Sequence, residues 1–206
     1  MLASKLTDYV EKAIVLAIPI GGVVVGYEIA HKLMVPLDVI VPRKIGAPFN
    51  PELAIGAVTE DGTTILDHQL VGYLGVSESH IGEESERQRL EIKRRLGLHR
   101  GDAPFPSLKG FHIILVDDGI ATGATVRAAL ASIRKKEPES LVLAVPVAPP
   151  SILRVLKKDA DAVICLATPE PFYAIGQFYR DFDQTTDDEI KRLLKLNKEE
   201  LKTLGN

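Results

Sequence analysis

Residues 113–125 read Ile-Ile-Leu-Val-Asp-Asp-Gly-Ile-Ala-Thr-Gly-Ala-Thr, and this segment decides which fold the chain predicts. Residues 111–116 are apolar except for His112, so they predict a central parallel strand buried on both faces. Residues 124–136 are alanine-rich at their start and predict a helix. The carboxyl end of such a strand opens into a crevice where a ligand can bind.

The loop between this strand and this helix has the chemistry of a phosphate site. Glycines lack a Cβ atom and let the backbone approach a ligand, while threonines supply hydroxyl donors. Free amides at the start of the helix, with the positive end of the helix dipole behind them, favour an anion. We therefore expect the phosphate to lie against Gly119, Ile120, Ala121, Thr122, Gly123, Ala124 and Thr125.

Two acids, Asp117 and Asp118, directly follow the strand. Side chains alternate along an extended backbone, so these two should point in different directions, and no single small ion would satisfy both. One carboxylate would then bind sugar hydroxyls, and the other a hydrated metal or a structural partner. Loop and acids together fit a sugar phosphate.

The segment closely resembles the phosphoribosyl pyrophosphate signature of type I phosphoribosyltransferases. In that family two acids follow a hydrophobic strand, and a Thr-Gly-x-Thr loop holds the 5-phosphate. The resemblance implies catalytic roles for Asp117 and Asp118 at the ribose hydroxyls. Three other interpretations stay open: a methyltransferase cofactor loop, a response-regulator acid pair, and an ordinary strand-turn-helix joint with surface acids.

The rest of the chain alternates strands with helices. Strands are expected near residues 14–18, 37–41, 141–145 and 162–167, and helices up to residue 12 and near residues 23–33 and 152–158. This order predicts an α/β fold with a mostly parallel twisted sheet flanked by helices. Residues 53–58 and 63–66 predict a hairpin, and residues 82–96 a polar helix that stops at Gly97. We expect one domain, with a core at residues 10–168, a small hood, and a cap at residues 169–206.

Composition narrows the class of protein. The 206 residues are 46% apolar and 26% charged, as in soluble globular proteins, and no run reaches the roughly 18 residues of a membrane span. The amino terminus does not resemble a secretion signal, and the single Cys165, expected in the core, suits a reducing cytoplasm. The net charge of -3 gives no reason to expect nucleic-acid binding. The histidine spacing predicts no zinc site.

Two segments are candidates for a pyrophosphate site. Adjacent glycines after the first strand expose backbone amides to an anion, and this loop resembles the family's pyrophosphate loop. Relatives often carry Arg or Lys where this chain has Ile20, so one expected cation is missing. A basic pair is expected at the end of the second strand. The predicted contacts are Ile20, Gly21, Gly22, Arg43 and Lys44; a plain strand exit and a solvated surface pair remain alternatives.

Residues 83–100 carry acids toward their start and bases toward their end. This polarity matches the helix dipole and fits an exposed, self-stabilised helix. The family places a mobile cover over its site in this part of the chain, which would exclude water from the reacting centre. The resemblance therefore implies a flexible lid with phosphate contacts from Arg87, Arg94 and His99.

Residues 172–182 hold five of the eleven Phe and Tyr residues. Aromatic rings can stack on a planar base, and the segment is similar to the base-binding region of purine phosphoribosyltransferases. It implies a base site at Phe172, Tyr173 and Asp181; a subunit interface or a packed cap explains the aromatics equally well. Thr186 with Glu189 predicts the start of a structural last helix.

Taken together, the resemblance implies an enzyme, a pentosyl glycosyltransferase. It would transfer the phosphoribosyl group from phosphoribosyl pyrophosphate to a nitrogenous acceptor, a purine-like base being one candidate, and release pyrophosphate. Mg²⁺ is the implied cofactor, bound through ligand and water near the two acids with no direct protein site. A homodimer is also implied. The alternative is a regulatory protein that binds phosphoribosyl pyrophosphate or nucleotides without turnover.

Overall fold

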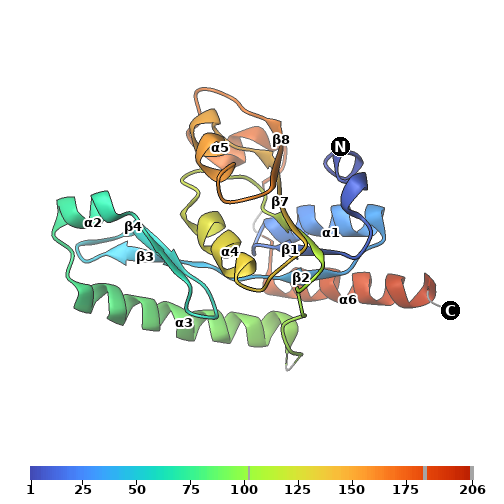
Figure 1. Ribbon diagram of the computed structural model, residues 1–206, viewed down its shortest axis with the longest axis horizontal. Coiled ribbons are helices and arrows are strands. Elements are labelled where there is room, and N and C mark those ends of the chain that lie inside the picture. The colour runs from blue at the N-terminus through green and yellow to red at the C-terminus, as the bar shows by residue number, and fades with distance from the viewer. Residues whose placement is uncertain (102, 183–184, 205–206) are drawn as a thin grey trace.

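The computed structural model describes residues 1–101, 103–182 and 185–204 and contains one large and one small sheet (Figure 1). The large sheet has the order β2-β1-β6-β7-β8, and all its pairings are parallel. Its strands are β1 (Ala13–Ala17), β2 (Leu37–Val39), β6 (His112–Val116), β7 (Ser140–Val147) and β8 (Ala162–Ala167). The predicted parallel α/β sheet is confirmed. Because β2 and β6 flank β1, the strand order reverses between β1 and β6, where a crevice opens at the carboxyl ends.

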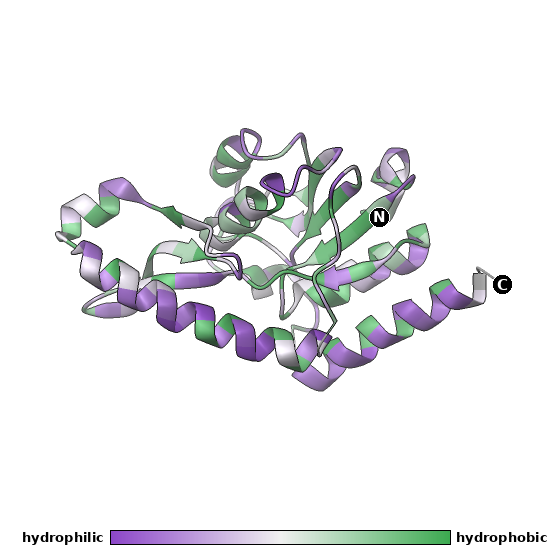
Figure 2. Cartoon of the chain, turned by 60° about the horizontal axis from the view of Figure 1, so that its bottom comes forward, coloured by the Kyte–Doolittle hydropathy of each residue, from purple (hydrophilic) through white to green (hydrophobic). Residues whose placement is uncertain are grey.

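Helices cover both faces of this sheet (Figure 1). The helices α1 (Gly22–Leu33) and α6 (Asp187–Leu204) lie on one face, and α4 (Ala124–Arg134) and α5 (Pro150–Leu156) on the other. Along β1, Val15 packs on the α1 side and Leu16 on the α4 side, so successive side chains enter two different cores. Burial on both faces explains why the strands are continuous apolar runs, which stand out as hydrophobic in Figure 2.

A second, antiparallel sheet forms a hood beside the first. It consists of β3 (Arg43–Ala47), β4 (Asn50–Val58) and β5 (Thr64–Leu66), with α2 (His68–Leu74) and α3 (Glu78–Arg100) around it. The predicted hairpin, β4 with β5, is confirmed, whereas β3 and α2 were not predicted. The predicted end of the polar helix at Gly97 is wrong, because α3 continues to Arg100. Tertiary contacts of His99 and Arg100 outweigh the low helix propensity of one glycine.

The predicted secondary structure is wrong at the amino terminus and confirmed at the start of the last helix. The expected helix before residue 12 is wrong: the segment forms two short 3-10 turns, η1 (Ala3–Lys5) and η2 (Thr7–Tyr9), which bury Leu2 and Leu6 against the α1 side of the core. The described part of the cap holds one 3-10 turn, η3 (Ile175–Phe178), before α6. The predicted start of the last helix is confirmed, since the Glu189 amide donates to Thr186 Oγ1 at 3.2 Å. Among the described helices, none has the length and apolar composition needed to cross a membrane.

Asp61 joins the hood to the core and leads to a stability prediction. Its carboxylate accepts hydrogen bonds from Thr59 Oγ1 at 2.7 Å, the Thr63 amide at 3.0 Å and Ser132 Oγ of α4 at 2.9 Å. Burial alone would raise the pKa of Asp61, but these hydrogen bonds lower it well below its usual value. We expect Asp61→Asn to reduce the free energy of unfolding by about 1 kcal/mol at pH 7, after allowance for solvent screening of this partly exposed group.

The sign of the pH dependence follows from the lowered pKa. The contribution of Asp61 is complete above the unfolded-state pKa of about 4 and is lost as pH falls toward the folded-state value. The difference between wild type and Asp61→Asn in urea unfolding should therefore shrink below pH 4. Asp188→Asn is the control, because the Asp188 side chain is 92% exposed. Equal stability of the Asp61→Asn variant and wild type at pH 7 would contradict the assignment.

Candidate active site

The acid pair lies where the sheet order reverses. Asp117 and Asp118 follow β6, and the Asp118 amide donates to Asp117 Oδ1 at 2.9 Å. The loop after β1 lies directly against them: a Cβ atom placed on Gly21 would overlap Asp118 Oδ2, and one placed on Gly22 would be 3.1 Å from Asp117 Oδ1. The expectation that the two side chains diverge is wrong. The chain bends at Asp118 rather than staying extended, so both carboxylates face the same glycine loop.

The surroundings raise the pKa of both acids. Burial raises the pKa of Asp117 well above its usual value, and the neighbouring charge of Asp118 raises it further. Burial also raises the pKa of Asp118. The hydroxyl of Tyr179 donates to the Asp118 carbonyl oxygen at 2.5 Å, and burial raises the pKa of Tyr179 to about 12, so it stays a donor. A ligand that brings hydroxyl donors or positive charge would therefore stabilise the ionised acids.

The loop from β6 to α4 is built for close approach. Gly123, at φ 78°, is the N-cap residue of α4 and has no side chain that could cap the helix, so no N-cap side chain occupies the amides of the first turn. Ala121 and Thr122 are exposed, and Thr125 is half-buried. Ile120 differs from the prediction: its amide donates to the Val147 carbonyl at 3.0 Å and its side chain is buried in the core. Ile120 therefore anchors the loop and has no amide left for a phosphate.

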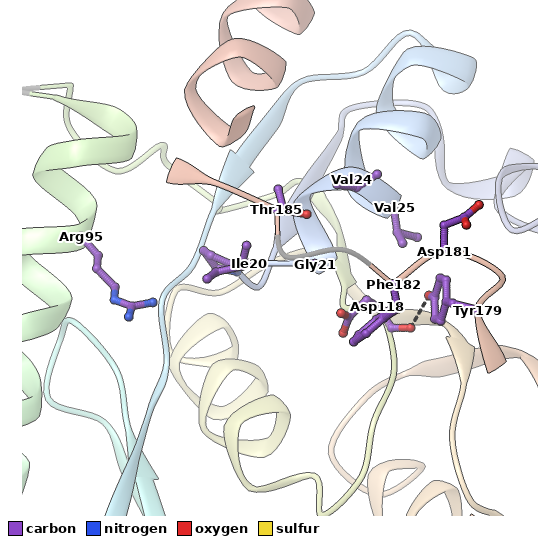
Figure 3. A pocket seen from close by; sticks show the side chains of 11 residues that line it. Ile20, Gly21, Val24, Val25, Arg95, Asp118, Tyr179, Asp181, Phe182 and Thr185 are labelled. Carbon is purple, nitrogen blue, oxygen red and sulfur yellow. Dashed lines mark hydrogen bonds between the residues drawn. The ribbon is translucent and has the colours of Figure 1, made fainter. Parts of the chain in front are cut away.

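A cavity of about 750 Å³ opens beside the acid pair, and we call it the acid-pair cavity (Figure 3). It extends from α3 on one side, past the glycine loop and the start of α1, to the aromatic segment on the other side. Its lining consists of Pro19, Ile20, Gly21, Val24, Val25, Arg95, Asp118, Tyr179, Asp181, Phe182 and Thr185. The carboxylates of Asp118 and Asp181 and the guanidinium of Arg95 thus face a space large enough for a nucleotide-sized ligand.

A second cavity, of about 480 Å³, lies between the hood and the start of α4, and we call it the basic cavity. Arg43, Lys44, Arg87 and Thr125 line it together with Glu52 and Glu84. Arg43 Nε donates to Gln88 Oε1 at 2.9 Å, and Arg87 donates two hydrogen bonds of 2.7 Å to Glu84. Three predicted phosphate contacts and the last threonine of the loop therefore lie together. The placement of the basic pair at the end of the second strand is wrong: β2 ends at Val39, and Arg43 begins β3.

Two predicted base contacts lie elsewhere. Phe172 packs on Phe178 with ring centroids 5.0 Å apart, and the Tyr173 side chain is 83% exposed; neither lines the acid-pair cavity. Asp181 does line it, together with Tyr179 and Phe182, which sequence reasoning did not select. The aromatic cluster gave the correct segment, but no periodicity in an irregular cap could identify which rings face inward.

Two predicted lid contacts also need correction. The His99 side chain is fully buried, and its Nε2 lies 2.7 Å from Asp187 Oδ1, so it fastens α3 to the start of α6. Arg94 makes two hydrogen bonds to Glu91, at 2.7 and 2.9 Å, and lines neither cavity. Arg95, which was not selected, reaches the acid-pair cavity instead. The sequence contained a signal for Arg95. Ile92, an apolar residue in a polar helix, marks the buried face of α3, and a residue three positions later lies near the same face.

Comparison with known proteins defines the class. Residues 2–183 match the family model described as phosphoribosyl transferase domain, and the chain belongs to this family. Two Mycobacterium tuberculosis proteins, provisionally named phosphoribosyl transferases, are 43% identical over 194 residues. The matched part covers 94% of this chain but 44% of theirs, so the chain spans less than half the length of these curated relatives. TT1426 from Thermus thermophilus, a protein of known crystal structure, is 41% identical in sequence to this chain. The two structures superpose with a TM-score of 0.79 over 94% of this chain and 92% of TT1426.

Proposed function

We propose that this protein transfers the phosphoribosyl group of phosphoribosyl pyrophosphate to a nitrogenous acceptor. The acceptor nitrogen attacks C1, the bond from C1 to the pyrophosphate oxygen breaks, and its electron pair leaves with pyrophosphate. The proton displaced from the acceptor passes to an ionised acid or to solvent. Positive charge develops on the sugar ring in the transition state, so the protein contributes mainly positioning and charge stabilisation.

The acid pair carries this proposal. Asp117 and Asp118 lie against Gly21 and Gly22 at the carboxyl end of β6, where burial and mutual repulsion disfavour two free charges. The 2- and 3-hydroxyls of a ribose would donate hydrogen bonds to these carboxylates and favour their ionised form. Ionised acids next to C1 would then stabilise the positive ring. Family membership of residues 2–183 supports the same assignment.

We assign protein contacts to the 5-phosphate and to the pyrophosphate from the residues of the signature loop and of the two cavities. The 5-phosphate binds the free amides at Gly123 and Ala124 and the hydroxyls of Thr122 and Thr125. The pyrophosphate extends toward the amides of Gly21 and Gly22 and the basic side chains of Arg43, Lys44 and Arg87. Mg²⁺ fits the donor set, since carboxylate oxygens of the acid pair and phosphate oxygens suit it. Its other contacts would run largely through ligand and water.

A base would occupy the acid-pair cavity beside Tyr179 and Phe182, whose rings pack on each other with centroids 5.2 Å apart, with Asp181 near its edge. The test incubates pure protein with Mg²⁺, labelled phosphoribosyl pyrophosphate and a panel of purines, pyrimidines and other amines. Pyrophosphate release that depends on one acceptor class is the expected result. Absence of any heat of association for the sugar pyrophosphate and for nucleoside monophosphates would overturn the proposal.

One observation favours a second candidate. Ile20 occupies the loop position where a cation was expected, and its side chain is 38% exposed at the acid-pair cavity. A protein that binds the sugar pyrophosphate as a regulator needs no charge stabilisation in a transition state. Tight binding in calorimetry without pyrophosphate release for any acceptor would identify this function. The expected homodimer and the expected cytoplasmic location remain predictions.

A further inference from the structure

We infer that Arg95 is the residue that binds the pyrophosphate group in place of the missing cation at position 20. Ile20 and Arg95 line the same cavity, one from the loop after β1 and the other from α3 (Figure 3). The inference rests on the proposed function and adds a determinant that the signature segment does not contain. It also gives α3 a second basic contact with the ligand, besides Arg87.

Charge in the acid-pair cavity supports this assignment. Asp118 and Asp181 contribute negative charge, and Arg95 is the one basic side chain among the described lining residues. Without Arg95, the side chains of this cavity would repel a pyrophosphate. A guanidinium binds phosphate oxygens through two parallel hydrogen bonds, which a single ammonium cannot do.

Arg95 is free to exchange partners at low cost. Its Nε donates to Glu91 Oε1 at 2.9 Å, one turn earlier on α3, and both side chains are partly exposed. Such pairs on a helix surface are weak. Glu91 also accepts two hydrogen bonds from Arg94, at 2.7 and 2.9 Å, so it keeps a cationic partner when Arg95 turns to a ligand.

The neighbourhood of Arg95 holds both cations and acids. Burial lowers the pKa of Arg43, and the charges of Arg95 and Arg87 lower it further, while those of Glu91 and Glu84 raise it. Guanidinium groups that repel one another across the space between β3 and α3 are stabilised by an anion placed among them. Arg95 and Arg43 are close enough for the charge of one to act on the other, so an anion placed between them would be attracted by both.

The position of α3 is fixed independently of any ligand. Ile92 is fully buried in the hood, and His99 is bonded to Asp187 of α6. Arg100 Nε donates to Asp38 Oδ1 at 3.0 Å, and another guanidinium nitrogen donates to the Val39 carbonyl at 2.6 Å. These contacts on both sides set the rotation of the helix. Arg95 is thereby held at the acid-pair cavity in the free protein.

The test compares Arg95→Gln with Arg89→Gln by calorimetry in the presence of Mg²⁺. Both substitutions remove one positive charge from α3, but Arg89 pairs with Glu86 and lines neither cavity of the proposed site. The probes are phosphoribosyl pyrophosphate and ribose 5-phosphate, which differ by the pyrophosphate group. Arg95→Gln should weaken phosphoribosyl pyrophosphate binding about tenfold or more and change ribose 5-phosphate binding less than about twofold. Arg89→Gln should change neither.

Three outcomes would overturn the inference. Arg95→Gln could bind phosphoribosyl pyrophosphate like Arg89→Gln, or it could weaken both probes equally. The third is an equal loss in Arg94→Gln, which would indicate a general effect of charge on α3. Circular dichroism and thermal unfolding establish that each variant is folded. If wild type binds neither probe, the proposed function fails; if wild type binds and only the Arg95 comparison is negative, the proposed function stands without this inference.

Discussion

Asp117→Asn is expected to reduce turnover by at least about 100-fold while raising the melting temperature at neutral pH. The loss follows because an amide oxygen carries no negative charge to stabilise the sugar ring or accept strongly from its hydroxyls. The substituted side chain would keep an oxygen for the Asp118 amide, which now donates to Asp117 Oδ1 at 2.9 Å. The fold should therefore survive, and Asp118→Asn should show a similar loss of sugar binding.

The gain in stability follows from the raised pKa of Asp117. Burial and the charge of Asp118 raise this pKa in the folded protein, so the folded state binds the proton more tightly than the unfolded state. The free energy of unfolding of wild type then falls as pH rises from about 4 through the folded-state value. Asp117→Asn removes this decline. Its advantage in melting temperature should be small at pH 4 and grow with pH, by about 2–4 °C for each kcal/mol relieved.

Asp161→Asn is a control of opposite sign. A hydrogen bond from Arg134 lowers the pKa of Asp161, so this variant should lose stability at neutral pH and match wild type in strong acid. Thermal unfolding from pH 2 to 8 and calorimetry with phosphoribosyl pyrophosphate measure both effects. Unchanged affinity in Asp117→Asn and Asp118→Asn would remove the acid pair from the site. A lower melting temperature of Asp117→Asn at neutral pH would contradict the raised pKa.

The parallel sheet could be predicted from sequence because its strands are buried on both faces. A continuous apolar run such as residues 113–116 has few other stable environments, and the glycines and threonines after it define the loop. The hood was harder to predict. Strand β3 contains Arg43 and Lys44, which suggest a solvated end rather than a strand, and it forms only because β4 pairs with it.

Contacts between distant segments explain most of the errors in the site. His99 is a reasonable phosphate ligand in sequence, yet Asp187 lies 88 positions away and binds it in the fold. Arg94 and Arg95 are adjacent and identical in type, and only the rotation of α3 decides which one lines the acid-pair cavity. Ile120 is in the correct loop, but its amide pairs with Val147 of β7. Local patterns identified the segments, and packing selected the individual residues.

Gly21→Ala is expected to weaken sugar pyrophosphate binding strongly through a single methyl group. A Cβ atom at this position would overlap Asp118 Oδ2 and lie 2.6 Å from Asp118 Cγ, far inside van der Waals contact. The Asp118 carboxylate must move, and Tyr179, bonded to its carbonyl, restrains the backbone from following. The substitution therefore displaces an acid without removing it. We expect a loss of affinity for phosphoribosyl pyrophosphate of about 100-fold or more, since a misplacement of about 1 Å can reduce function by that factor.

Gly82→Ala on α3 is the matched control, because nothing lies within 4 Å of the Cβ atom it would add. Alanine in a helix interior is favoured over glycine by about 0.5–1 kcal/mol, so this variant should be slightly more stable than wild type and bind normally. Gly21→Ala combined with Asp118→Gly separates the two causes. Removing the carboxylate relieves the clash, so thermal stability lost in Gly21→Ala should return in the double variant while sugar binding stays weak. Normal affinity of Gly21→Ala would mean that the glycine loop and Asp118 can move apart without consequence, and neither would then define the ribose site.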